Sequence, residues 1–317
     1  MTAIRTGVVG VGHLGYHHAR NYAALDQAVL VGIVDPDDAC ATKAAEDFGV
    51  PRFGSVAELV RAGIDAASVV VPTRAHHAVA LELLEAGVDV LVEKPIADSV
   101  AHAAEMVEIA AAGKRILQVG HIERFNGAVV ALSGAIREPK FIECHRLSPY
   151  PSRGDDVSVV LDLMIHDLDI VLALEHSEIV SVDAVGVPVF SQFEDIANAR
   201  LRFASGCVAN LTSSRVSMER MRKIRIFEAN AYVSTDYSGQ EVLVYRKEPG
   251  PIPEGVSPME RIAIEALPVE HDEPLKLELA SFVRCVEARE RPVVAGQDGL
   301  RALELAQQVI DFIRGHA

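Results

Sequence analysis

The first 120 residues alternate between apolar, strand-like runs and helix-like segments, and this alternation constrains the fold more than any other feature of the chain. The runs IRTGVVG, AVLVGIVD, AASVVVP, DVLVEKP and RILQVGH are rich in Val, Ile and Leu. Helices between them end at Gly49, Gly63, Gly87 and Gly113, where we expect left-handed C-caps. Strands that are apolar on both faces are typical of a parallel sheet with helices on both sides. The segment is therefore predicted to be an α/β doubly wound parallel sheet.

After about residue 122 the pattern changes. One helix is expected at about 123–136, followed by the strand KFIECHRLS and a helix that contains LDLMIHDLD. Several strand-like segments with short Gly or Asn turns come next, which predicts an α+β domain with a mainly antiparallel sheet and helices on one side. We expect domains at 1–121 and 122–317, with the last helix able to pack back on the first domain. No flexible linker separates them, so the two domains are expected to enclose a cleft.

A glycine-rich motif directly follows the first strand and opens a helix. In the predicted Rossmann domain Gly10 permits a tight turn, Gly12 lets a pyrophosphate approach the backbone, and Gly15 allows close packing of helix and strand. Asp35 ends the second strand, where a carboxylate accepts hydrogen bonds from ribose hydroxyls and repels a 2′-phosphate. NAD is therefore expected rather than NADP. The cofactor-binding residues of this motif are Gly10, Gly12, His13, Leu14, Gly15 and Asp35.

The strand DVLVEKP delivers Glu93 and Lys94 to the edge of the sheet where ligands bind in open α/β folds. Pro95 stiffens the exit from the strand. An ammonium group held near a nicotinamide ring can hydrogen-bond the substrate oxygen that becomes a carbonyl. The alternative is an ordinary solvated Glu-Lys pair at a strand end.

Three titratable side chains occur in the otherwise apolar helix LDLMIHDLD. Since each helical residue advances about 100°, Asp162, His166 and Asp169 fall within an arc of about 60°. That face either meets water or lines a site. A structural role in polar contacts between helices is one alternative. Metal binding is the other, although no second His or Cys stands at the i+4 position that a zinc helix motif needs, and no metal is expected.

Five segments carry a resemblance to a known family. GVVGVGHLG, VPTRAHHAVALELLEAG, VLVEKP, QVGHIERF and DLMIHDLD occur in the order and spacing of the Gfo/Idh/MocA oxidoreductases, and the chain resembles this family over essentially its whole length. The resemblance implies a Rossmann domain followed by an α+β domain whose open sheet face makes dimers or tetramers. It also implies that Lys94 is the catalytic lysine. His76 matches the histidine of the family's TPxxxH stretch, and since this chain has Pro72-Thr73 in place of Thr-Pro, any hydroxyl contact must come from Thr73.

By the same resemblance, Asp162 and His166 match an Asp-x3-His pair that faces the nicotinamide. Oxidising a secondary alcohol requires that a hydride pass to the cofactor and a proton to a side chain, and histidine suits the second task because its pKa lies near the working pH. His166 is accordingly the expected general base and Lys94 the assisting acid, and a reversed emphasis of the two roles stays open. Asp162 would orient the imidazole of His166 or contact a substrate hydroxyl, and Lys94 would stabilise the developing alkoxide.

Other polar residues are placed near the predicted cleft. His121, Arg124 and Asn126 follow the last strand of the first domain, and Tyr150 and Arg153 precede the His166 helix. His121 is assigned to the cofactor, and Lys94, Arg124, Asn126, Tyr150, Arg153, Asp162 and His166 are assigned to the substrate. His17, His18, His77 and His102 lie on expected helices and are interpreted as surface or packing residues.

A basic stretch, Arg215 to Arg225, would suit an anionic substrate such as a nucleotide sugar, or would be a surface strand paired with acidic neighbours. Several segments, QVGHIERFN and ERMRKIRIF among them, most resemble the branch of the family that oxidises the C3 hydroxyl of UDP-N-acetylglucosamine for lipid A. Three alternatives stay open: a dehydrogenase of a free sugar or polyol such as an inositol, an NAD-dependent glycosidase, and a redox-sensing binding protein.

Charge and composition limit the partners. The net charge of −15 argues against nucleic acid as a ligand. No apolar run approaches the roughly 20 residues of a membrane span, and the N-terminus lacks a signal-peptide pattern. Four widely spaced cysteines fit reduced thiols in a cytoplasm. We therefore expect a cytoplasmic homodimer or homotetramer that acts on a small molecule.

Overall fold

The structure is a computed structural model that describes residues 3–150, 157–237, 239–252 and 255–316. The chain divides into two compact units. The first combines Met1–Phe125 with Glu273–Glu304, and the second combines Asn126–Asp272 with Leu305–Ala317. The first unit thus joins the N-terminal segment to a C-terminal one.

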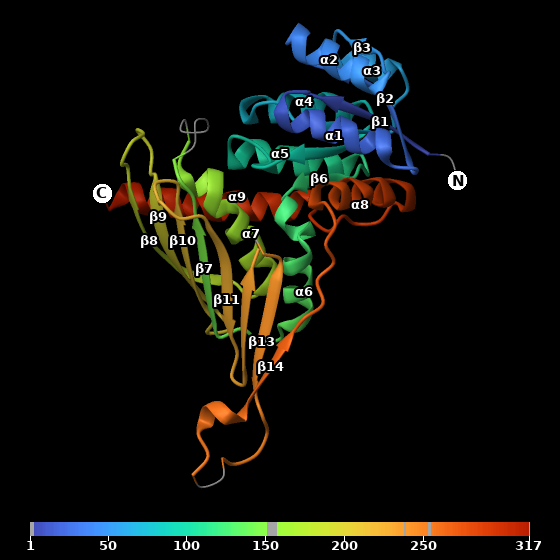
Figure 1. The fold of residues 1–317 in the computed structure, drawn as a ribbon. Coiled ribbons are helices and arrows are strands. Elements are labelled where there is room, and N and C mark those ends of the chain that lie inside the picture. The colour runs from blue at the N-terminus through green and yellow to red at the C-terminus, as the bar shows by residue number, and fades with distance from the viewer. Residues whose placement is uncertain (1–2, 151–156, 238, 253–254, 317) are drawn as a thin grey trace. The chain divides into compact units, whose positions relative to one another are not determined.

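The first unit is built on a six-stranded parallel sheet with strand order β3-β2-β1-β4-β5-β6 (Figure 1). This is the order of a doubly wound dinucleotide-binding fold, and it confirms the predicted fold class. The strand order reverses between β1 and β4, which is where such folds bind their ligands. The strands are β1 (Ile4–Val9), β2 (Ala28–Val34), β3 (Arg52–Phe53), β4 (Ala66–Val69), β5 (Asp89–Glu93) and β6 (Leu117–Gly120).

Helices cover both faces of this sheet. One face carries α1 (His13–Ala24), α2 (Asp38–Phe48) and α8 (Pro274–Ala288), whose apolar side chains share one core with β1 and β2. The other helices of the unit are α3 (Val56–Arg61), α4 (His76–Glu85), α5 (Val100–Ala112) and the start of α9 (Gly296–Gly315), and the short 3-10 turns Thr73–Ala75 and Ile122–Phe125 follow β4 and β6. Strands buried on both sides explain the continuous apolar runs in the sequence.

Three of the four glycines predicted to form left-handed C-caps do so. Gly49, Gly63 and Gly87 have the positive φ of left-handed caps. The prediction is wrong for Gly113, whose φ is −78°, because the following residue, Lys114, takes the left-handed conformation with a φ of 53°. The chain therefore turns one residue later than the glycine.

The second unit contains an eight-stranded sheet with strand order β14-β13-β12-β11-β7-β10-β9-β8. Only the β7–β10 pairing is parallel among the described strands, so the predicted mainly antiparallel sheet is confirmed. The strands are β7 (Phe141–Leu147), β8 (Ile179–Val187), β9 (Ile196–Phe203), β10 (Val208–Ser214), β11 (Met221–Phe227), β12 (Ala231–Asp236), β13 (Glu241–Lys247) and β14 (Ile262–Ala266).

Burial alternates along these strands. In β11, Ile224 and Ile226 are fully buried whereas Arg225 and Phe227 are exposed, as the alternating sequence predicts. One face of the sheet therefore forms a core and the other is open. The helices of the unit are α6 (Gly127–Ala135) and α7 (Ile165–Leu174), together with the end of α9 (Gly296–Gly315), and a 3-10 turn lies at Pro258–Arg261.

The helix around LDLMIHDLD is not a regular α-helix throughout. Val160–Met164 form a π-helical turn that continues into α7. Asp162 lies in the π turn and His166 in the α-helix, so the uniform spacing of about 100° per residue assumed for them does not hold. Single π turns inside helices recur at functional sites. No helix in the described part of the chain combines the length and the apolar character needed to cross a bilayer.

Candidate cofactor and catalytic site

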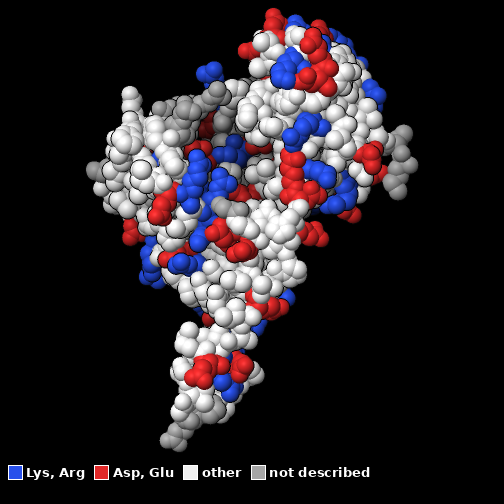
Figure 2. Space-filling view, in the orientation of Figure 1, with Lys and Arg blue, Asp and Glu red and all other residues white. Residues whose placement is uncertain are grey.

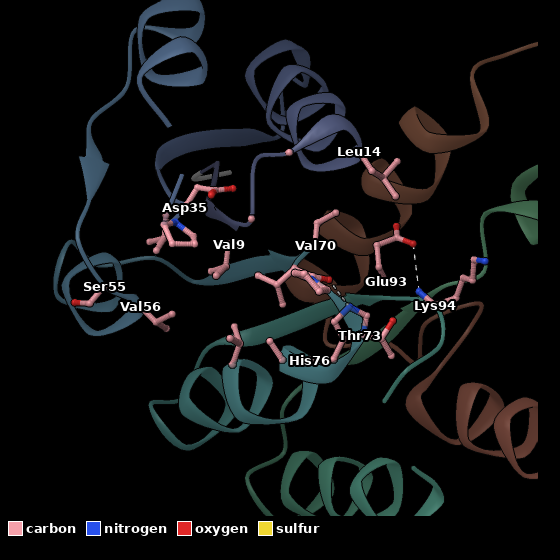
Figure 3. A pocket seen from close by; sticks show the side chains of 18 residues that line it. Val9, Leu14, Asp35, Ser55, Val56, Val70, Thr73, His76, Glu93 and Lys94 are labelled. Atoms are coloured by element: carbon pink, nitrogen blue, oxygen red, sulfur yellow. Dashed lines mark hydrogen bonds between the residues drawn. The ribbon is translucent and has the colours of Figure 1, made fainter. Parts of the chain in front are cut away.

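The carboxyl ends of β1, β2, β4 and β5 surround a cavity of about 810 Å³ in the first unit (Figure 3). Its lining is mostly apolar, with Asp35 at one end and Glu93 and Lys94 at the other. An elongated apolar cavity with a few polar groups suits a flat, extended ligand. The lining residues are Val9, Gly10, Gly12, Leu14, Val34, Asp35, Pro36, Ser55, Val56, Val70, Val71, Pro72, Thr73, Ala75, His76, Val79, Glu93 and Lys94.

The three glycines of the motif differ in the space around them. A Cβ on Gly15 would lie 1.9 Å from the carbonyl oxygen of Gly10, so helix α1 packs too closely on the turn for any side chain. Gly10 has a φ of +87°, and a Cβ there would lie 2.5 Å from the carbonyl oxygen of Val70. Gly12, by contrast, has no atom within 4 Å of the position of a Cβ, and it lines the cavity. The backbone at Gly12 is therefore open to a ligand.

The start of α1 has no side-chain cap, which it shares with α4 and α8. Asp37, Ser55 and Ser99 cap α2, α3 and α5 with side-chain hydrogen bonds, whereas no side chain caps α1 at Gly12. The first turn of α1 also contains no acidic residue. Backbone N–H groups and the helix dipole at such an end attract an anion, and the bare end of α1 suits a pyrophosphate.

Asp35 supports the glycine turn from the end of β2. One carboxylate oxygen accepts a hydrogen bond from the Val11 N–H at 2.6 Å, and the other accepts one from the Asp37 N–H at 2.8 Å. Each carboxylate oxygen can accept a second hydrogen bond, so Asp35 keeps acceptor capacity toward the cavity. The residue can thus hold the turn and a ribose hydroxyl together.

His76 ties together the ends of β4 and β5. Its Nδ1 lies 2.9 Å from the carbonyl oxygen of Pro95, and its Nε2 lies 2.9 Å from the carbonyl oxygen of Val71. Burial lowers the pKa of His76, although these two acceptors and the charge of Glu93 act in the opposite direction. His76 therefore shapes the cavity by fixing two strand exits. The peptide bond between Lys94 and Pro95 is cis.

Glu93 connects the cavity to a buried polar chain. Its Oε1 accepts a hydrogen bond from Nε2 of His18 at 3.2 Å, and its Oε2 accepts one from the Lys94 N–H at 3.2 Å. Burial acts to raise the pKa of Glu93, but the hydrogen bond from His18 and the contacts with Lys94 lower it overall. Glu93 is therefore held as a carboxylate beside the Lys94 side chain.

In the second unit, a buried ion pair holds the helix that carries His166. Arg146 on β7 donates to both carboxylate oxygens of Asp167, at 3.0 and 2.8 Å. The two side chains are only 4% and 3% exposed. Asp162 and His166 are half-buried, whereas Asp169 is buried. The pair fixes the rotation of α7 immediately next to His166.

Comparison with known proteins agrees with both units. Residues 4–121 match the oxidoreductase family with an NAD-binding Rossmann fold, and residues 127–233 match the GFO/IDH/MocA C-terminal domain. The chain belongs to the Gfo/Idh/MocA oxidoreductase family. This finding confirms the family and the NAD cofactor expected from the sequence.

Individual members of the Gfo/Idh/MocA family are similar over the full length. The UDP-N-acetylglucosamine 3-dehydrogenase of Acidithiobacillus ferrooxidans is 38% identical over 98% of this chain and 97% of that protein. A solved structure of the enzyme from the same organism superposes with a TM-score of 0.91, at 35% identity and 99% coverage of both chains. The myo-inositol 2-dehydrogenase of Thermotoga maritima is 27% identical over 95% of this chain and 94% of its own.

The NAD-binding domain of this Gfo/Idh/MocA protein brings most of the predicted cofactor residues together. The cavity is lined by Gly10, Gly12, Leu14, Asp35, Pro72, Thr73, His76, Glu93 and Lys94. Three predicted residues lie outside its lining: His13, Gly15 and His121. Gly15 acts through packing, and His121 is buried after β6.

The predicted substrate residues are spread over both units. Arg124 donates to the Val293 carbonyl oxygen at 3.4 Å, and Asn126 is buried and caps α6 through the Ala128 N–H at 3.0 Å. Tyr150 packs edge-to-face on Phe190, with 5.2 Å between ring centroids. Lys94 belongs to the first unit, and Asp162 and His166 belong to the second. Arg153 lies outside the described residues.

The basic stretch is largely neutralised by acidic partners. Arg215 is fully buried and donates to Asp195 at 2.8 Å, so it cannot contact a ligand. Lys223 pairs with Asp236 at 3.4 Å, and Arg225 pairs with Glu143 at 3.2 Å. Figure 2 likewise shows acidic side chains next to basic ones on the second unit. The interpretation as a paired strand therefore accounts for most of the stretch.

Sequence reasoning missed two kinds of site residue. The apolar wall of the cavity, from Val9 and Val34 to Val79, comes from strand ends and helix starts whose side chains carry no chemical signal. His18, interpreted as a surface or packing residue, is fully buried and hydrogen-bonded to Glu93. Within the described residues, no cluster of three or more His, Cys, Asp or Glu side chains could hold a metal ion.

Proposed function

We propose that this chain catalyses the NAD-dependent oxidation of the C3 hydroxyl of UDP-N-acetylglucosamine to the 3-keto sugar. The observation that carries the proposal is the similarity to the enzyme of Acidithiobacillus ferrooxidans, which extends over 98% of this chain and 97% of that protein. The inositol 2-dehydrogenase relative is more distant, at 27% identity. Full-length similarity includes the substrate-binding domain, where members of one family differ in specificity.

The cavity residues fit an NAD molecule along their length. We assign the ribose to Asp35, the pyrophosphate to the open backbone at Gly12 and the bare start of α1, and the nicotinamide to the end with Glu93 and Lys94. His13, Leu14, Gly15, Pro72, Thr73, His76 and His121 complete the proposed cofactor set. When bound, NAD accepts the hydride from the substrate carbon.

The catalytic roles fall to Lys94, His166 and Asp162. We propose that His166 removes the hydroxyl proton as general base, because an imidazole has a pKa near neutrality. Lys94 stabilises the negative charge that develops on the same oxygen. Asp162 orients the imidazole or holds a neighbouring hydroxyl. Arg124, Asn126, Tyr150 and Arg153 are the further residues proposed to contact the substrate.

A panel of substrates tests the activity. The purified chain is incubated with NAD and, separately, with several UDP-sugars, free sugars and inositols, and the absorbance of the reduced cofactor is followed. We expect reduction with UDP-N-acetylglucosamine and a ketone at C3 by mass spectrometry and NMR. Reduction with an inositol and a flat trace with every UDP-sugar would replace the proposal with a polyol dehydrogenase.

Single-turnover kinetics test the catalytic roles. Replacing Lys94 by Met or His166 by Asn is expected to slow hydride transfer by about 10²–10⁴-fold, the usual contribution of a general acid or base. Affinity for NAD should change little in the His166→Asn variant, because His166 lies outside the cavity of the first unit. An unchanged rate in either variant would remove that residue from the mechanism.

We also propose that the open face of the second sheet joins copies of the chain into a homodimer or homotetramer. Four aromatic rings stack in succession across that sheet, with centroid separations of 5.7, 4.7 and 5.1 Å. The rings belong to Phe141, Phe227, Tyr232 and Tyr245. Light scattering should give twice or four times the mass of one chain, and the mass of one chain would contradict this proposal.

The proposed reaction places the enzyme in the cytoplasm, where NAD and nucleotide sugars are available. The described cysteines, Cys40, Cys144, Cys207 and Cys285, carry no disulfide, which suits a reducing compartment. The 3-keto product is the substrate that an aminotransferase needs to install a 3-amino group, as in lipid A precursors. Recovery of the protein in a periplasmic fraction would contradict this assignment.

A further inference from the structure

A chain of hydrogen-bonded side chains leads from the cavity into the interior of the first unit. His18 on α1 contacts Glu93 through Nε2 and Ser68 on β4 through Nδ1, at 3.2 and 3.1 Å. The Ser68 hydroxyl lies 2.8 Å from the hydroxyl of Tyr22. His18, Ser68 and Tyr22 are fully buried, and only Glu93 reaches the cavity. This series of hydrogen-bonded side chains therefore opens only at the proposed nicotinamide end of the cavity.

The hydrogen bonds in this chain have a defined direction. A carboxylate only accepts, so Nε2 of His18 must donate to Glu93. In the neutral imidazole, Nδ1 then accepts from the Ser68 hydroxyl. The Ser68 oxygen also has lone pairs, so it can accept instead if Nδ1 gains a proton. The geometry thus accommodates one additional proton on His18 with only a rotation of the hydroxyl group.

A second carboxyl group stands beside this chain. Glu278 on α8 is fully buried, and neither of its side-chain oxygens has a hydrogen-bond partner. Burial and the charge of Glu93 raise the pKa of Glu278 well above its usual range, which favours the neutral, protonated form of this group. A Cβ on Gly120 would lie 2.7 Å from Oε1 of Glu93, so β6 packs directly on the carboxylate.

Few charged groups therefore lie around His18 and Glu93. Glu93 is an anion, Glu278 is neutral, and Tyr22 is kept protonated because burial raises its pKa. Lys94 provides a cation beside Glu93, and His76 faces Glu93 from α4 with a pKa lowered by burial. The ring of oxidised nicotinamide carries a positive charge, which the reduced ring lacks.

We propose that His18 and Glu93 form a buried proton-binding site whose occupancy depends on the redox state of the bound cofactor. The inference rests on the proposed position of the nicotinamide next to Glu93 and Lys94. With the oxidised cofactor, the positive ring balances Glu93 and repels a proton from His18. With the reduced cofactor that repulsion is gone, and the His18–Glu93 pair takes one proton from water in the cavity through Glu93, while the hydride comes from the substrate.

The proposal predicts that the protein takes up a different number of protons when it binds NADH than when it binds NAD. A tenfold difference in proton affinity between the two complexes corresponds to about half a proton at the pH midway between their two pKa values. Calorimetric titration of the complete chain with NAD and with NADH, each in two buffers of different ionisation enthalpy, measures this number directly. The ratio of NADH to NAD affinity should also increase as the pH falls, because the reduced complex binds the additional proton more tightly.

Three variants locate the proton. His18→Gln should abolish the difference between the two nucleotides, whereas Glu278→Gln should retain it, because Glu278 is neutral in both complexes. His77→Gln is the matched control, since His77 also pairs with a carboxylate, Glu105, at 2.7 Å but lies outside the cavity lining. Loss of the difference in Glu278→Gln would place the proton on Glu278 and overturn the assignment.

The wild-type chain alone can refute the inference, even if a variant fails to fold. Equal proton numbers for NAD and NADH would overturn the redox-dependent site and leave the proposed function intact. Failure of both nucleotides to bind would instead refute the cofactor assignment on which the inference rests. A difference in proton number without oxidation of any UDP-sugar would support the site and contradict the proposed substrate.

Discussion

Replacing Asp167 by Asn should destabilise the second unit by several kcal/mol and loosen the helix that carries His166. The carboxylate accepts two hydrogen bonds from Arg146 at 3.0 and 2.8 Å, and both side chains are almost completely buried. Charge-assisted hydrogen bonds contribute about 1.5–3 kcal/mol each. Removing one member of a buried ion pair costs about 3–5 kcal/mol, because the remaining charge stays buried without its counterion.

Urea denaturation followed by circular dichroism measures this loss, since the chain has no tryptophan to report by fluorescence. Glu143→Gln is the control, because its pair with Arg225 is 28% and 46% exposed and should contribute less than about 1 kcal/mol. The double variant Arg146→Met, Asp167→Leu should recover most of the lost stability. A loss below about 1 kcal/mol in Asp167→Asn, or a double variant as unstable as the sum of the single variants, would refute the reasoning.

Three further perturbations follow from the first unit. Asp35→Ser removes the charge that repels a 2′-phosphate, so the NADP-to-NAD affinity ratio from calorimetric titration should rise by about tenfold; an unchanged ratio would contradict that role. Gly15→Ala should lower the free energy of unfolding by about 1–3 kcal/mol through its clash with the Gly10 carbonyl, whereas Gly134→Ala, with no atom within 4 Å of its Cβ, should not. Glu278→Gln should raise the urea midpoint more at pH 8 than at pH 5, because a raised folded-state pKa costs stability only above the ordinary pKa of a glutamate. An equal effect at both pH values would contradict a protonated Glu278.

The sequence could predict the cofactor cavity because its determinants are local. The motif spans only the first strand, the turn after it and the second strand. Within it, Gly10 and Gly15 stand where a Cβ would clash with backbone atoms, and Asp35 accepts a hydrogen bond from the turn. Parallel strands then bring Glu93 and Lys94 to the same edge without further information. The same local logic explains why Gly113 was mispredicted, since a left-handed residue one position later satisfies the same helix end.

The buried polar chain could not be predicted in this way. His18, Ser68 and Glu93 come from a helix and two strands that lie 50 and 25 residues apart in sequence, and no periodic pattern links them. A histidine on an amphipathic helix gives the same sequence signal whether it meets water or a carboxylate. The π turn before α7 was missed for a related reason, because one extra residue in a helix leaves the apolar pattern nearly intact.

A chain of net charge −15 can bind an anionic dinucleotide where the N-terminus of a helix faces the ligand. Apart from His76, the titratable residues that line the cavity are Asp35, Glu93 and Lys94, and no arginine is among them. In the proposed binding mode the pyrophosphate lies at the backbone N–H groups at the start of α1, whose end has no side-chain cap and no acidic residue in its first turn. In this proposed mode Asp35 contacts the ribose and Glu93 faces the cationic ring, and the backbone groups at the pyrophosphate contribute no net charge. Net charge therefore argues against polyanionic partners without arguing against this cofactor.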